Sequence, residues 1–91
     1  MTRDEKLPIL KKDLQMLTSA NDEYLLILLD QAEALIKREG VKLMDDIESD
    51  MLVIQYAAYL FRKRAGTETA MPRFLRFQIN NLLFSQKGRG Q

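Results

Sequence analysis

Apolar residues recur with the period of an α-helix in the first half of the chain. Between residues 7 and 17 the spacing i, i+3, i+7 and i+10 places four leucines on one stripe: Leu7, Leu10, Leu14 and Leu17. Between residues 22 and 39 the apolar residues occupy one side of the helical wheel and charged residues the other. The pattern predicts two amphipathic helices, over residues 7–17 and 22–39. Ser19 or Asn21 is expected to cap the second helix.

The second half of the chain predicts two further helices, over residues 48–65 and 72–86. The third helix is apolar on every side, which is typical of a central core helix or of one that also meets another subunit. The fourth helix has a core face formed by Leu75, Ile79, Leu82 and Leu83. Its opposite side carries Phe74, Phe77 and Phe84, here called the Phe stripe. Because one small core cannot serve both faces, the Phe stripe is either partly core or a contact with another subunit.

Prolines and glycines are placed where helices begin and end. Pro8 and Pro72 precede periodic stretches and suit first helical turns, and Gly40 and Gly66 follow such stretches as C′ residues do. No strand pattern and no internal repeat is present. The chain is therefore expected to be all-α, a single domain over residues 1–91 built as a small four-helix bundle, with residues 87–91 as a short flexible basic tail.

The composition argues against catalysis. The chain has no cysteine and no histidine, which removes disulfides, thiolate zinc sites and the commonest general base. The carboxylates of Asp45, Asp46, Glu48 and Asp50 lack the EF-hand spacing and are explained by helix capping, Asp45 or Asp46 being the expected cap of the third helix. We expect no enzyme activity, no cofactor and no bound metal.

No membrane or export signal is apparent. The longest apolar run, Tyr24–Leu29, is far shorter than the roughly 20 residues that cross a bilayer. The first six residues are mostly charged and lack the apolar segment of a signal peptide. The expected compartment is the cytoplasm, without membrane contact.

The net charge of +1 hides an uneven distribution. Residues 1–61 carry seven basic and twelve acidic side chains, a net charge of −5, whereas residues 62–91 carry seven basic side chains and only Glu68, a net charge of +6. Such asymmetry indicates a charged partner. The basic end could contact a phosphate backbone, or it could pair with the acidic half of a neighbouring copy in a head-to-tail assembly.

Three stretches of the sequence resemble a known family. They are Asn21–Leu25 with the helix that ends at Lys37–Gly40, the buried segment Leu52–Arg64, and the Pro-started segment Met71–Lys87. Together they cover most of residues 7–87, and the last is the most specific. The sequence is similar to the head–tail connector, or head-completion adaptor, family of tailed bacteriophages, namely siphophages and their prophages. The chain departs from the family in ending soon after its last helix, where relatives use a C-terminal extension to grip the portal.

The resemblance implies a structural virion protein in the phage neck, assembled in the cytoplasm of the host bacterium. Its copies form a ring, a dodecamer on the portal, although the subunit can be a monomer in solution. The ring sits below the portal protein, extends the channel of the packaged DNA and docks the next neck or tail protein. The family implies neither enzyme activity nor a cofactor.

The residues expected to serve these contacts fall into two sets. The subunit or portal interface is expected to include the Phe stripe and part of the third helix: Tyr56, Tyr59, Phe61, Phe74, Phe77 and Phe84. Contacts with the DNA channel or an acidic partner are expected from Arg62, Lys63, Arg64, Arg73, Arg76, Lys87 and Arg89. Two alternatives stay open: a small helical DNA-binding phage regulator, and an intracellular interaction module such as an antitoxin or adaptor.

Overall fold

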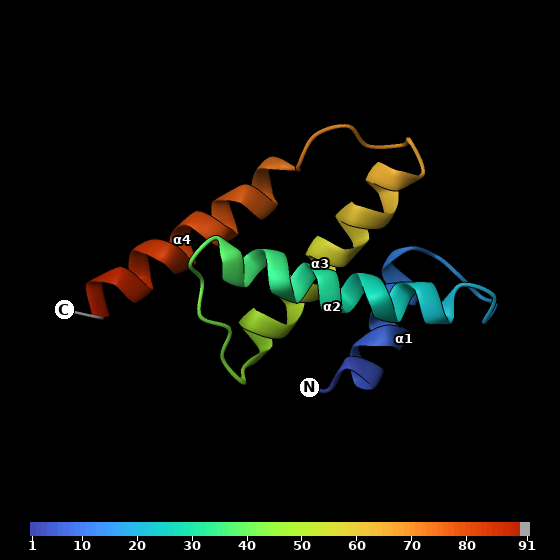
Figure 1. The fold of residues 1–91 in the computed structure, drawn as a ribbon, viewed down its shortest axis with the longest axis horizontal. Helices are drawn as coiled ribbons and strands as arrows, with labels where there is room; N and C mark the ends of the chain where they lie inside the picture. Colours follow the sequence, from blue (N-terminus) through green and yellow to red (C-terminus); the bar gives the residue numbers. More distant parts are fainter. Residues whose placement is uncertain (90–91) are drawn as a thin grey trace.

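The computed structural model describes residues 1–89, with side chains through Lys87. In this part of the chain the regular structure consists of four α-helices, without any strand. The helices are α1 (Arg3–Asp13), α2 (Asp22–Arg38), α3 (Ile47–Arg64) and α4 (Arg73–Arg89). Figure 1 shows α2 running across α3, with α1 near one end of the pair and α4 extending from the other. The predicted all-α class with four helices is confirmed.

Helix α3 is the centre of the fold, because each of the other three helices packs against it. Its buried residues include Leu52, Val53 and Ile54 in one turn and Ala57 and Ala58 in the next, all at most 2% exposed. Residues adjacent in a helix point in different directions, so neighbours must lie on several sides. The apolar pattern of this helix therefore reflects its central position within one chain.

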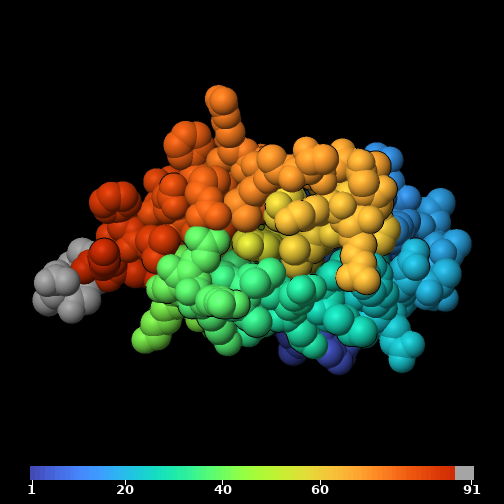
Figure 2. Space-filling view, turned by 45° about the horizontal axis from the view of Figure 1, so that its top comes forward, coloured from blue at the N-terminus to red at the C-terminus, as the bar shows by residue number. Residues whose placement is uncertain are grey.

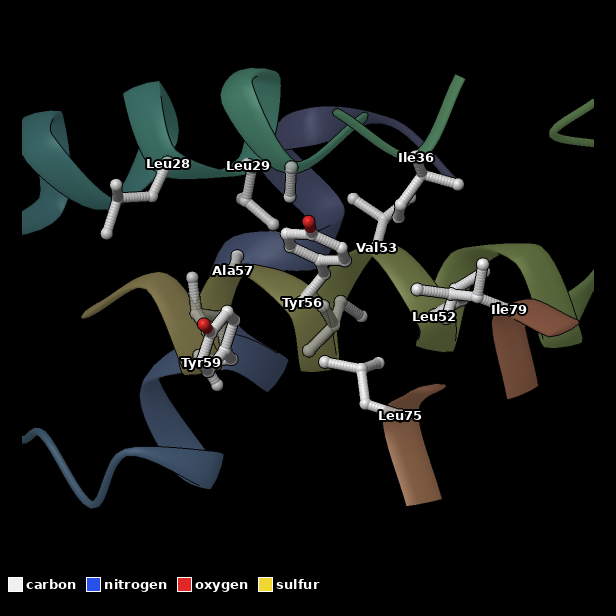
Figure 3. Close-up of a cluster of buried hydrophobic side chains, with 14 of the residues drawn as sticks. Leu28, Leu29, Ile36, Leu52, Val53, Tyr56, Ala57, Tyr59, Leu75 and Ile79 are labelled. Atoms are coloured by element: carbon white, nitrogen blue, oxygen red, sulfur yellow. The ribbon is translucent and has the colours of Figure 1, made fainter. Parts of the chain in front are cut away.

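The core lies between α3 and the two helices on either side of it. Leu29 and Ile36 of α2 face Val53 of α3, and Leu75 and Ile79 reach α3 from α4 (Figure 3). All five side chains are at most 2% exposed. Burial of each such side chain contributes roughly 1.5–3 kcal/mol relative to exposure.

Helix α1 begins at Arg3, earlier than the predicted start at residue 7, because Thr2 and Glu5 form a capping box. The Glu5 N–H donates to Thr2 Oγ1 at 3.2 Å, and the Thr2 N–H donates to Glu5 Oε1 at 2.7 Å. The second bond lowers the pKa of the Glu5 carboxyl below its ordinary value. Pro8 consequently lies in the middle of the helix, which corrects the expectation that it belongs to the first helical turn.

The end of α1 also differs from the prediction. The helix stops at Asp13, and Gln15 adopts a left-handed backbone conformation with φ 58°. This change of direction takes Leu17 off the leucine stripe, and its side chain is 98% exposed. Leu14 still packs against the core, so the stripe is correct only as far as Leu14.

The other helix ends lie close to their predicted positions. Asn21 is the N-cap residue of α2 but makes no side-chain cap bond, whereas Asp46 caps α3 by accepting a hydrogen bond from the Ser49 N–H at 2.8 Å. Gly40 (φ 103°) and Gly66 (φ 82°) follow α2 and α3 in conformations that favour glycine.

Helix α4 is attached through one face only. Leu75 and Ile79 are fully buried against α3, and Leu82 and Leu83 pack on the same core. The helix continues to Arg89, so the predicted helix end at residue 86 is wrong, and residues 87–89 of the predicted tail are helical. Residues 90 and 91, the rest of that predicted tail, lie outside the described residues.

Candidate interaction surface

The Phe stripe lies on the outward side of α4. Phe74 is 56% exposed, Phe77 63% and Phe84 81%, on the side of the helix opposite the buried Leu75 and Ile79. Figure 2 shows α4 as a ridge from which side chains stand out into solvent. Of the two possibilities that the sequence left open for this stripe, burial in the chain's own core is therefore excluded for all three rings.

The surroundings of the Phe stripe are polar or positively charged. Asn80 and Asn81 are exposed between the second and third rings, and Arg73 is exposed at the start of the helix. No aspartate or glutamate occurs in α4, and Arg73 makes no ion pair within the part of the chain that the structure describes. Beside Phe84 an open groove of about 630 Å³ lies between α4 and the α2–α3 connection. This surface is suited to an apolar partner that carries negative charge.

Polar contacts fix the position of α4 against the end of α2. Arg76 Nη1 and Nη2 donate to the two carboxylate oxygens of Glu39 at 2.7 and 3.1 Å. These hydrogen bonds raise the pKa of Arg76 above its ordinary value. Further along, the Gln86 side-chain amide accepts from the Lys42 N–H at 2.8 Å and donates to the Lys42 carbonyl at 2.7 Å. The guanidinium of Arg76, predicted to face DNA or an acidic neighbour, is therefore held by a carboxylate of its own chain.

The basic residues at the end of α3 also have partners within the chain. Arg62 Nη2 donates to the Asp13 carboxylate and carbonyl, both at 3.3 Å. Lys63 and Arg64 each lie over a tyrosine ring, at 5.9 and 5.7 Å from the ring centroid. Since Lys63 and Arg64 are exposed, they still contribute positive charge to the surface.

The predicted basic set thus does not form one patch. Arg73 lies at the start of α4, whereas Lys87 is exposed near the end of the same long helix. The side chain of Arg89 lies outside the described residues. Two of the seven predicted residues are exposed beside the Phe stripe: Arg73 near Phe74 at the start of α4, and Lys87, which lines the groove beside Phe84.

The prediction that Tyr56 and Tyr59 serve an interface is wrong, because both side chains are only 7% exposed. Figure 3 shows them inside the core, with Tyr56 directed toward α2. Phe61 is partly buried and packs against the Tyr24 ring, with ring centroids 6.3 Å apart. The aromatic residues of α3 are therefore packing residues, and the candidate surface contracts to the Phe stripe.

The burial of Tyr56 predicts an alkaline loss of stability. Burial raises the pKa of the Tyr56 hydroxyl above its ordinary value of about 10. The folded state then holds this proton more tightly than the unfolded state, so the associated stability is present below about pH 10 and is lost as the pH rises through the folded-state pKa. In urea unfolding between about pH 9 and pH 11.5, Tyr56→Phe should lose less stability than the unsubstituted chain. Equal losses would contradict this assignment.

A second exposed apolar site lies where the α2–α3 connection enters α3. Met44 is 51% and Ile47 67% exposed, and the residues around them are acidic. We call residues 44–48 the acidic corner: Met44, Asp45, Asp46, Ile47 and Glu48. The capping interpretation of its carboxylates did not include this surface, although the interleaving of two apolar residues with three acids is present in the sequence.

Neither a metal centre nor a membrane span is found in the described part of the chain. Its acidic side chains nowhere form a group of three that could hold a metal ion. No helix over residues 1–89 is both long and apolar enough to cross a bilayer.

Comparisons with protein-family models, curated proteins and solved structures gave no match. The Phe stripe, Arg73 and the acidic corner are therefore interpreted from their own chemistry.

Proposed function

We propose that this chain is a structural subunit of a phage or prophage neck, a head–tail connector that forms a ring below the portal. The observation that carries the proposal is the exposed Phe stripe on α4. Large apolar side chains gathered on one exposed surface are typical of a site that another protein covers. The stripe belongs to the segment Met71–Lys87, which carries the most specific part of the resemblance to connector proteins.

The proposed role is assembly and not catalysis. The ring, a dodecamer on the portal, lies in the virion neck, extends the DNA channel and receives the next neck or tail protein. Contact with packaged DNA is non-specific and depends on exposed basic side chains such as Lys63, Arg64 and Arg73, since such side chains neutralise phosphates without reading bases. The subunit can be a monomer before it reaches the portal.

The geometry of α4 favours this role over that of a DNA-binding regulator. A helix-turn-helix motif joins its helices by a three- or four-residue turn, whereas the connection between α3 and α4 extends over residues 65–72. A recognition helix also presents polar, base-reading side chains, whereas α4 presents three phenylalanines. An interaction module would use the same Phe stripe on a protein outside the virion, so only an experiment in the phage separates these two roles.

Deletion of the gene from the phage or prophage that encodes the chain tests the proposal. We expect DNA-filled heads and separate tails that do not join, visible by electron microscopy, and no infectious particles. The unsubstituted gene supplied in trans should restore infectivity, and Phe77→Asp should not, because it places a charge in the Phe stripe. Leu17→Asp is the matched control, since Leu17 is 98% exposed and lies away from the stripe.

The outcomes distinguish the three roles. Normal tailed particles after deletion would eliminate the connector role. Unchanged particles with altered phage transcription would indicate a regulator, which should also bind duplex DNA with sequence selectivity. Unchanged particles with capture of a non-virion protein through the Phe stripe would indicate an interaction module. Circular dichroism of Phe77→Asp must match that of the unsubstituted chain for its complementation result to count.

A further inference from the structure

The chemistry of α4 specifies what kind of surface can cover the Phe stripe. The rings favour apolar contact, and Arg73 is exposed and has no ion pair in the described residues. A partner that covers the rings would remove water from this guanidinium, which then favours a carboxylate beside it. Glu68 is the one acidic residue after residue 61, so α4 and its approach offer almost no negative charge of their own. The partner must therefore combine exposed apolar and acidic side chains.

The acidic corner of the same chain has this combination. Ile47 and Met44 supply apolar surface at 67% and 51% exposure. The carboxylate of Asp45 is 96% exposed, and Glu48 is exposed and makes no ion pair within residues 1–89. Apart from Lys42 just before it, the sequence from Glu39 to Met51 is free of basic residues. The two surfaces are thus complementary both in charge and in apolar content.

Other charges of the two halves are already paired within the chain. Arg62 pairs with Asp13 and Arg76 with Glu39, so part of the charge asymmetry seen in the sequence serves folding. Arg73 remains on one surface, and Asp45 and Glu48 remain on the other. Asp45 lies 3.4 Å from the N-terminal ammonium group, but with its high exposure it stays accessible to a second cation.

The two surfaces do not cover each other within one copy, because the three rings and Ile47 are all more than half exposed. In Figure 1, α4 runs along the upper left edge of the molecule, whereas the connection into α3 turns at the lower edge. The bonds of Arg76 to Glu39 and of Gln86 to Lys42 hold α4 in this place. A contact between unlike surfaces of two copies is heterologous, and repetition of such a contact builds a ring or a filament.

We propose that the Phe stripe of one copy docks on the acidic corner of the next, with Ile47 and Met44 against the rings and Arg73 beside Asp45 or Glu48. The proposal rests on the proposed function in that it names the neighbour within the ring. It is tested with purified protein, so its outcome does not depend on the phage experiment.

Cysteine cross-linking tests this contact directly, because the chain contains no cysteine of its own. Asn81→Cys places a thiol on the Phe stripe, and Glu48→Cys places one on the acidic corner. Cross-linking under mild oxidation traps weak contacts, so it works even when most of the protein is monomeric. The two variants carry tags of different size, so that the mixed dimer can be told from each homodimer. When they are mixed at high concentration, they should give mainly the mixed disulfide dimer. A double variant with both cysteines should give a ladder of higher oligomers.

Controls separate this contact from its alternatives. Lys12→Cys, exposed and away from both surfaces, reports random collision with either variant. A mixed dimer no more abundant than the pairs formed with Lys12→Cys would overturn the proposal. Predominance of the Asn81→Cys homodimer would also overturn it, because that product indicates a symmetric contact between two Phe stripes.

Charge reversal tests the pairing of Arg73. Arg73→Glu in the Asn81→Cys chain should reduce the mixed dimer several-fold, and Asp45→Lys in the Glu48→Cys chain should restore much of it. The Glu48→Cys chain lacks the carboxylate of Glu48, so this exchange tests the pairing of Arg73 with Asp45. An unchanged mixed dimer, or a loss without restoration, would overturn that pairing. If the mixed dimer forms but gene deletion leaves particles intact, the chain self-associates in this way but is not a connector. If gene deletion abolishes tailed particles but no mixed dimer forms, the chain is a connector whose Phe stripe contacts a different neighbour.

Discussion

Replacing Leu75 by alanine is expected to lower the free energy of unfolding by about 2–5 kcal/mol. The Leu75 side chain is fully buried where α4 meets α3, so its truncation removes apolar contacts and leaves a cavity. Small domains are stable by only about 5–15 kcal/mol in total, so the variant should be close to unfolding. Urea unfolding followed by circular dichroism measures the loss.

Phe77→Ala is the matched control on the same helix. Phe77 is 63% exposed, and a substitution of this kind away from the core should change the free energy of unfolding by less than about 0.5 kcal/mol. The same substitution should remove most of the mixed dimer in the cross-linking experiment. A large destabilisation by Phe77→Ala would mean that the ring packs within its own chain, and the Phe stripe would then need no partner.

The second large effect is expected at Gly40. This residue has φ 103°, and a Cβ atom built on it would lie 3.3 Å from Leu83 Cδ2 of α4. Gly40→Ala therefore combines backbone strain with crowding against α4 and should cost about 1–3 kcal/mol. Thermal unfolding followed by circular dichroism would show the cost as a lower midpoint temperature.

Gly66→Ala separates the two contributions. Gly66 has φ 82°, but a Cβ atom there would meet nothing within 4 Å, so only the backbone cost remains. The loss at Gly40 should exceed the loss at Gly66. Adding Leu83→Ala to Gly40→Ala should cost less than the sum of the two single losses, because the crowding disappears. Strict additivity would show that Leu83 does not oppose the new methyl group.

Local patterns predicted most of the helices correctly. The apolar face of α2 and the cap of α3 at Asp46 depend on residues within a few positions of one another, which is the range over which helix geometry acts. The errors at α1 have local causes of a less visible kind. Helix α1 starts at the capping box of Thr2 and not near Pro8. Gln15 adopts a left-handed conformation after the helix, so Leu17 no longer lies on the leucine stripe.

The candidate surface was predicted only in part. Phe74, Phe77 and Phe84 were placed correctly on the side of α4 opposite its core face, since both faces follow from helical spacing. The tyrosines of α3 were predicted at an interface because a helix that is apolar on every side is also typical of one that meets another subunit. Residues 44–48 were missed because their exposure depends on how the connection leaves α2, which periodicity does not describe.

By itself the sequence determined four helices, their apolar faces and a charge difference between the two halves, because these follow from composition and from contacts near in the chain. Only the tertiary structure decided which faces are covered and which charges remain unpaired. Arg76 meets Glu39 across 37 positions and Arg62 meets Asp13 across 49, and no local pattern encodes such pairs. The physical reason is that burial and ion pairing depend on the arrangement of whole helices around α3, whereas periodicity describes one helix at a time.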